Sequence, residues 1–320
     1  KAFAQLGYLP ICLHINAKYV GAAQNRPRFI MLAVRSDVAD EIPMNYDPSL
    51  AQAIGQARDF ERSVKQGRKV EITDLKCYSI EDDIGFFRGE VFGVLASHYN
   101  SLASVKDAIG DLQSNRHKES PYVTSINKIK AGKKGSIDKL VNHELRSNNP
   151  LVQSRFRVYQ IISTLDKRHS KQVSKFLRDP ESCEIDDCCM EELLKHDFLD
   201  SDGQLTSLNT RSLVMRHLAS LKTKKQTQRA LIPDVPAPAA LSIPDDACHW
   251  NKNLTRTLTV REMARIQSFP DWFVFRSKVT TGGKMRRFEV PQYTQVGNAV
   301  PPLLGQALAR AVKAILNSTC

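Results

Sequence analysis

The chain has 320 residues and a formal net charge of +12, with 42% apolar and 25% charged residues. This composition excludes disordered and fibrous proteins and leaves room for two domains. No run of 18 apolar residues exists, so no membrane span is predicted, and seven scattered cysteines are typical of reduced thiols in a cytoplasm. The excess of cations favours a partner that carries phosphate groups, although a basic protein without such a partner has the same charge.

The first 35 residues are predicted to form a helix and two strands, because residues 10–17 and 28–34 are apolar runs of a length suited to buried strands. Gln24, Arg26 and Arg28 recur at every second residue, a spacing that puts all three on one face of a strand. Arg28 leads directly into the second run, so its guanidinium is expected at the edge of a core, where it needs a carboxylate, a phosphate or a base carbonyl. A structural ion pair is the alternative.

Residues 36–47 contain acids and prolines and are predicted to be a loop. An amphipathic helix is expected near 48–66, with strand-like pieces at 69–75 and 86–96. Positive charge then concentrates in residues 115–175, which hold fourteen Lys or Arg and four acids.

The next stretch, residues 179–202, reverses the sign with ten acids and one lysine. It contains three cysteines and His196, but their spacing matches no zinc template, so no metal site is predicted. The preferred interpretation is a pair of solvated acidic helices whose residues 193–199 face inward. Residues 229–246 are rich in proline and are predicted to be a connection.

A helix is expected at 259–268, because Thr259 and Glu262 form a Thr-x-x-Glu capping box. Arg261 and Arg265 lie four residues apart and so share one face of that helix. A loop of two glycines follows, and its cations are expected to be solvated or to contact phosphates: Lys278, Lys284, Arg286 and Arg287.

The last segment places Gly297-Asn298 before a helix whose start is marked by Pro301 and Pro302. Apolar residues then recur at helical spacing, which predicts that one face packs on a core while the corner faces outward. A backbone corner at a helix N-terminus suits a polar ligand, although most such corners are ordinary capping turns.

Three blocks, at residues 21–34, 256–273 and 292–312, resemble the last conserved blocks of DNA (cytosine-5) methyltransferases, in the same order. The resemblance implies the C-terminal part of a doubly wound, Rossmann-like α/β methyltransferase sheet with an inserted target-recognition domain. Residues 1–36 would be the last strands of the catalytic domain, 37–250 the recognition domain, and 251–320 a segment that returns to the catalytic domain.

The same resemblance assigns roles to residues. Arg28, supported by Arg26, would hold an extruded cytosine, while S-adenosyl methionine would be closed in by the corner. The corner residues are Gly297, Asn298, Ala299 and Val300. The residues expected to contact DNA are Lys284, Arg286 and Arg287, and those expected to be structural are Gln24, Arg261 and Glu262.

The family's other landmarks are missing: no cysteine follows a proline, and neither a Glu-Asn-Val segment nor a Gly-rich cofactor turn is present. We therefore expect a C-terminal portion of a methyltransferase that lacks the nucleophile and catalytic glutamate and is inactive without an N-terminal half. Double-stranded DNA would be its substrate, in a prokaryotic cytoplasm, near the nucleoid, in a restriction-modification system. The alternatives are a subunit of a split methyltransferase, a non-catalytic DNA-binding remnant, and an RNA-binding protein that uses residues 115–175.

Overall fold

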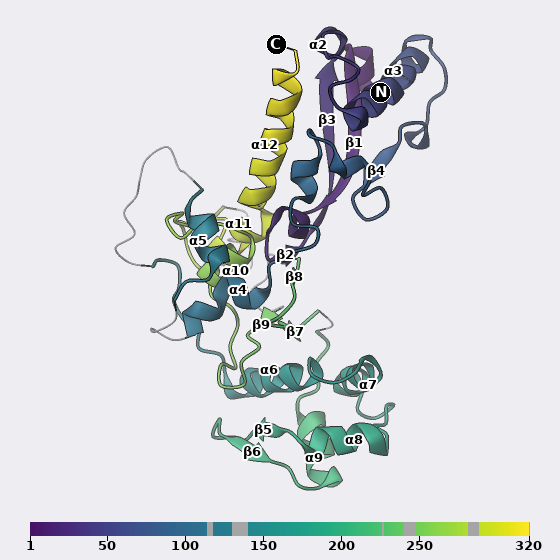
Figure 1. Cartoon of the computed structure of the whole chain (residues 1–320). Helices are drawn as coiled ribbons and strands as arrows, with labels where there is room; N and C mark the ends of the chain where they lie inside the picture. The colour runs from purple at the N-terminus through teal and green to yellow at the C-terminus, as the bar shows by residue number, and fades with distance from the viewer. Residues whose placement is uncertain (114–117, 130–139, 226, 240–246, 281–287, 320) are drawn as a thin grey trace.

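The computed structural model describes residues 1–113, 118–129, 140–225, 227–239, 247–280 and 288–319. Three clusters of buried apolar side chains organise these residues. In Figure 1 the strands of the first cluster and helix α12 occupy the upper part, and the helices of the third cluster form the lower part.

The first cluster is built on a three-stranded sheet of order β3-β1-β4. Strand β1 (Tyr8–Asn16) pairs antiparallel with β3 (Pro27–Arg35) and parallel with β4 (Cys77–Ser79). The prediction of a buried strand is confirmed for β1, in which seven of nine residues are buried. For residues 28–34 it is wrong, because β3 is an edge strand with Phe29 58% exposed.

Helix α3 (Pro48–Lys65) packs on β1 and confirms the helix predicted near 48–66. Its N-cap, Asp47, is buried and accepts hydrogen bonds from the amides of Leu50 (2.9 Å) and Val91 (2.9 Å). A Cβ on Gly89 would lie 2.5 Å from a carboxylate oxygen of Asp47, so this glycine lets the loop approach the cap closely.

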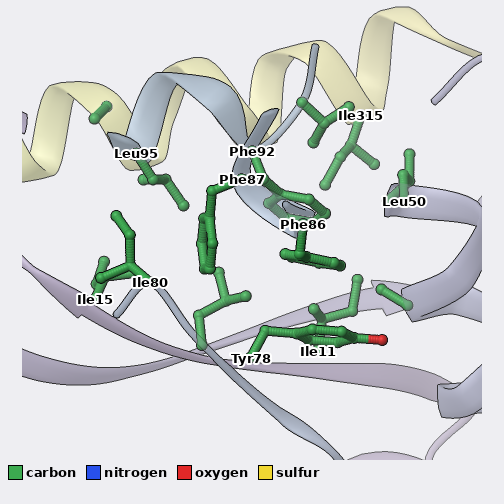
Figure 2. Close-up of a cluster of buried hydrophobic side chains, with 14 of the residues drawn as sticks. Ile11, Ile15, Leu50, Tyr78, Ile80, Phe86, Phe87, Phe92, Leu95 and Ile315 are labelled. Carbon is green, nitrogen blue, oxygen red and sulfur yellow. The ribbon is translucent and has the colours of Figure 1, made fainter. Parts of the chain in front are cut away.

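The strand-like pieces at 69–75 and 86–96 are not strands. They contain the short 3₁₀ helices η2 (Ile72–Asp74), η3 (Phe86–Arg88) and η4 (Gly93–Ala96). For residues 86–96 the reason is visible in Figure 2, where Phe86, Phe87 and Phe92 all enter one core together with Tyr78. Consecutive residues of a strand point to opposite faces, so Phe86 and Phe87 can share a core only on a tighter backbone.

The second cluster joins helices from the middle and the end of the chain. These are α4 (Val105–Ile109), α5 (Pro121–Asn127), α10 (Val260–Ile266) and α11 (Gln292–Asn298). Helix α10 contacts both α4 and α11, so it connects the middle of the chain to the last segment. The Thr259/Glu262 capping box of α10 is present as predicted.

The third cluster unites four helices with a short hairpin. Its elements are α6 (Pro150–Ile162), α7 (Lys167–Arg178), α8 (Asp187–Leu194), α9 (Arg211–Ser220), β5 (Asp197–Leu199) and β6 (Leu205–Ser207). Leu193, Phe198 and Leu199 are buried, which confirms the inward orientation of the apolar side chains in residues 193–199. The predicted pair of acidic helices is wrong, because residues 179–202 hold one helix, α8, followed by strand β5, and Lys195 is exposed. Among the described residues no group of His, Cys, Asp or Glu could hold a metal ion.

The remaining elements are short, apart from α12, and several of them add side chains to these clusters. They are α1 (Ala2–Gln5), η1 (Ala17–Val20), β2 (Gln24–Asn25), α2 (Ser36–Asp40), η5 (Gly110–Gln113), β7 (Arg229–Ala230), β8 (Ala237–Pro238), β9 (Ala247–Cys248) and α12 (Pro302–Asn317). The proline-rich connection thus contributes two short strands, β7 and β8. Strand β7 pairs with β9, and strand β8 pairs with β2.

Residues 37–250, expected to form a recognition domain, contribute side chains to all three clusters. Helix α3 packs on the N-terminal strand, and α4 and α5 pack with α10 and α11. The packing therefore favours a smaller separate unit around α6 to α9, and the limits of a recognition domain stay a prediction.

Within the described part of the chain, one stretch, residues 292–317, is long and apolar enough to cross a membrane by length and composition. It is divided into α11 and α12 by the turn that contains Pro301. Leu304, Ala307 and Ile315 of α12 belong to the first cluster, so the stretch supplies core packing in this fold.

Candidate active site

The segment between β2 and β3 presents side chains with the alternation that the spacing predicted. Gln24 (0% exposed) and Arg26 (4% exposed) are buried, Arg28 is half-buried, and the residues between them face solvent. Asn16, at the end of β1, accepts a hydrogen bond from the Arg26 amide at 2.8 Å, which holds the backbone where β2 passes into β3.

Arg26 reaches across the fold to the end of α11. Its Nη2 donates to the carbonyl oxygens of Gly297 (2.7 Å) and Ala299 (3.2 Å), 271 and 273 residues away in sequence. Carbonyls at a helix C-terminus have no partners within the helix and carry a partial negative charge, so a cation there is stabilising. Burial and the positive charge of Arg28 lower the pKa of Arg26 to about 10, which leaves it charged at neutral pH.

The Gly297-Asn298 corner lies at a different place relative to the helices than the sequence predicted. Gly297 and Asn298 are the last residues of α11, and the turn before α12 is formed by residues 299–301. The N-terminus of α12 offers few donors, because its prolines have no N–H and the Leu303 amide already donates to Ser268 Oγ at 3.1 Å. Asn298 and Val300 (60% exposed) remain on the surface of the corner.

Gln267, just beyond α10, also holds this corner. Its Nε2 donates to the carbonyl of Val296 at 2.6 Å, one residue before the first carbonyl bound by Arg26. The last turn of α11 is therefore held by side chains from two distant segments. Gln267 was not among the predicted site residues, and an isolated glutamine in a helix end carries no sequence signal for such a bond.

Arg28 has a different environment. Its Nη1 donates to the carbonyl of Pro27 at 2.7 Å, and the side chain has no ion pair among the described residues. The structural ion pair considered as an alternative is thus not seen in that part of the chain. A half-buried guanidinium with unused donors is suited to bind an acceptor from outside the protein.

Gln24 is the most unusual polar group of the site. Its side chain is completely buried, and neither Nε2 nor Oε1 has a hydrogen-bond partner among the described residues. Buried amides are normally satisfied, and an orphan in a native fold points to a bound water or ligand group.

Helix α10 supports the site through buried charges. Arg261, fully buried, donates to the carbonyls of Val141 (3.0 Å), Pro270 (3.1 Å) and Phe273 (2.7 Å). Glu262 accepts two hydrogen bonds from Arg256, at 2.8 and 2.7 Å, in addition to closing its capping box. These partners are protein groups, so the described contacts of Arg261 and Glu262 are structural.

His249 lies beside this network and makes stability depend on pH. Burial lowers the pKa of His249 to about 4, while its ordinary value is 6.5. Between pH 6.5 and pH 4, His249 therefore binds a proton in the unfolded chain but not in the folded chain. The stability that neutral His249 contributes is fully present above pH 6.5 and is lost as the pH falls toward 4. We expect a loss of about 2.4 kcal/mol, measured by urea unfolding between pH 7 and pH 4.5.

The matched variant for this prediction is His249→Gln, which cannot titrate and should remove most of the slope. Glu262 acts at lower pH: burial alone would raise its pKa, but Arg256 outweighs burial and holds it below 4.5. An unchanged slope in His249→Gln would assign the dependence to other groups.

Four cysteines lie in environments that favour the neutral thiol. Burial raises the pKa of Cys12, Cys77 and Cys248, and it raises that of Cys189 to about 11. A nucleophilic cysteine needs the thiolate, so these four positions are poorly suited to that role. The predicted DNA contacts Lys284, Arg286 and Arg287 lie outside the described residues.

The model of the C-5 cytosine-specific DNA methylases matches residues 1–314. The chain belongs to this family. Arg26 connects two segments of this methylase that are far apart in sequence, the strand after Gln24 and the Gly297-Asn298 block.

Individual methylases also resemble this chain. The putative type II methyltransferase M.OihORF3336P of Oceanobacillus iheyensis is 25% identical over 330 aligned positions, which cover 98% of this chain and 63% of that protein. M.AquIB of Picosynechococcus sp. is 42% identical over 93 residues, 28% of this chain and 66% of that protein. M.Bpa9945I of Bacillus paralicheniformis is 53% identical over 62 residues, 19% of this chain and 12% of that protein.

These matches correct the prediction of a C-terminal portion. The family match is not confined to the two ends of the chain but runs through residues 1–314, so the inference of an incomplete, inactive enzyme that needs a separate half is overturned. Identity to M.OihORF3336P is 25% over the full alignment, whereas identity to M.Bpa9945I is 53% over 62 residues, and only such short stretches are visible as motifs.

Proposed function

We propose that this methylase is a DNA (cytosine-5) methyltransferase of a type II restriction-modification system that acts on duplex DNA with S-adenosyl methionine as donor. The observation that carries the proposal is the bond from Arg26 to the last turn of α11, which brings the Gln-x-Arg-x-Arg segment beside the Gly-Asn block. Family membership and the type II methyltransferases among its relatives support it. We place the protein in a prokaryotic cytoplasm, near the nucleoid.

In this proposal the two arginines have separate tasks. Arg28, with unused donors, would bind the exocyclic oxygen of a cytosine turned out of the duplex. Arg26 is occupied by backbone carbonyls, so it would act by positioning the corner. Gln24 would complete the pocket, since its buried amide needs a partner that the described part of the chain does not supply.

S-adenosyl methionine would contact the corner at residues 297–300 and supply the methyl group carried on its sulfonium. The corner suits such a ligand, because Asn298 exposes an amide without a protein partner in the described region and Val300 adds an apolar surface. Since Gly297 and Ala299 use their carbonyls to bind Arg26, cofactor contacts would come from Asn298 and Val300.

Target recognition would be concentrated in the unit around α6 to α9, which packs on its own cluster. The loop with Lys284, Arg286 and Arg287 would contact the DNA backbone, as its charge suggests. Arg261 and Glu262 would keep α10 rigid between this unit and the corner.

Deleting the gene from its host is expected to remove 5-methylcytosine from one recognition sequence throughout the genome. Reintroducing the natural gene should restore the modification, and the Arg28→Ala gene should not, because the extruded base would lose its clamp. Bisulfite sequencing of genomic DNA measures all three strains.

The matched control is Arg68→Ala, which removes an exposed arginine far from the corner and should restore methylation fully. Methylation that survives deletion of the gene would contradict the proposed function. Methylation restored by the Arg28→Ala gene would leave the proposed function intact but would contradict the proposed role of Arg28.

A further inference from the structure

Helix α7 carries the most concentrated positive charge of the third cluster. Its sequence, KRHSKQVSKFLR, contains five cations and no acid. Four residues anchor one side of the helix in the core: His169, Val173, Phe176 and Leu177. Burial of that side leaves the basic side directed to solvent.

Three lysines form a row along this exposed side. Lys167, Lys171 and Lys175 are four residues apart, so they lie on one face at intervals of about 6 Å. They line a surface hollow of about 500 Å³ with Arg168 and Gln172. Its walls are thus built mainly from lysine and arginine stems that carry their charges toward water.

The neighbouring carboxylates are already engaged. Asp186 accepts hydrogen bonds from Arg168 (2.7 Å) and Gln172 (2.9 Å), and Asp166 caps α7 and binds His169 (2.8 Å). None of the three lysines of the row has an ion pair among the described residues. The row therefore keeps its full charge for an external anion.

We infer that the lysine row of α7, residues 167, 171 and 175, binds successive phosphates on the backbone of duplex DNA. The inference rests on the proposed function and adds a contact surface to it. A line of ammonium groups on a rigid helix matches a line of phosphates better than it matches a single small anion. Because phosphates carry no base identity, the row would orient the recognition unit on DNA without choosing the sequence.

The test is the salt dependence of DNA binding. A triple variant with Lys167→Gln, Lys171→Gln and Lys175→Gln keeps good helix formers at all three positions. The slope of log affinity against log salt is expected to become shallower by about 2.7, from three phosphate contacts at about 0.9 each. Fluorescence anisotropy with a labelled duplex, titrated at several potassium chloride concentrations, measures it.

A control triple variant, Lys65→Gln, Lys69→Gln and Lys313→Gln, removes the same charge elsewhere and should leave the slope nearly unchanged. Equal slopes in the α7 variant and the natural protein would overturn the lysine row while leaving the proposed function intact. Absence of duplex binding by the natural protein would overturn both. Tighter binding to single-stranded RNA than to duplex DNA would also contradict the inference.

Discussion

Replacing Arg265 with leucine is expected to lower the free energy of unfolding by about 3–5 kcal/mol. Arg265 is 3% exposed and binds two buried carboxylates, Asp271 at 2.8 and 2.7 Å and Asp111 at 2.8 and 2.7 Å. Leucine would leave Asp111 without the cation that it pairs with, and Asp271 with only Arg261 at 3.9 Å. Because Trp272 is adjacent to Asp271 and donates to the carbonyl of Ile129 at 3.1 Å, its fluorescence reports unfolding at this place.

Two controls separate this effect from general damage. Arg62→Leu breaks an exposed pair with Asp59 and should cost no more than about 1 kcal/mol. Combining Arg265→Leu with Asp111→Asn and Asp271→Asn removes the stranded charges and should recover part of the loss. A loss for Arg265→Leu as small as that for Arg62→Leu would show that the buried network does not hold the second cluster together.

The Arg26→Ala variant is expected to bind S-adenosyl methionine roughly five- to 150-fold more weakly. Without the guanidinium, the carbonyls of Gly297 and Ala299 lose their partner and the corner loses its fixed position. Leaving such groups unpaired costs about 1–3 kcal/mol, and 1.4 kcal/mol corresponds to a factor of ten. Titration calorimetry with the cofactor measures the change.

Arg28→Ala is the matched variant, because it removes the neighbouring guanidinium without touching the corner. It should keep the cofactor affinity of the natural protein and lose DNA methylation. Arg26→Lys should recover part of the affinity, since an ammonium can still bind one carbonyl. If Arg26→Ala and Arg28→Ala weaken cofactor binding equally, the division of roles between the two arginines is wrong.

Local features of this methylase followed from sequence patterns that depend on neighbouring residues. The capping box of Thr259 and Glu262, the helix that begins after Asp47 and the buried strand β1 are examples. Caps and periodic apolar residues act within one or two turns of the chain, so the residues that decide them stand side by side in the sequence.

The pieces at 69–75 and 86–96 show where such patterns fail. Their apolar, β-branched and aromatic residues suit a strand, yet a shared core for Phe86 and Phe87 required 3₁₀ turns instead. Burial was likewise decided by neighbours in space: residues 28–34 are as apolar as β1 but lie at the edge of the sheet. Tertiary packing overrode local preference in both places.

The sequence by itself determined the family, the main helices and the candidate arginines, because short motifs and local periodicity carry that information. The tertiary structure alone decided what each arginine does. The Gly297 carbonyl at the end of α11 accepts a hydrogen bond from Arg26, which is 271 residues away in sequence. Arg28, two residues after Arg26, keeps guanidinium donors without a partner among the described residues. A helix end must satisfy its carbonyls with whatever lies beside it, and only the folded chain determines which side chain that is.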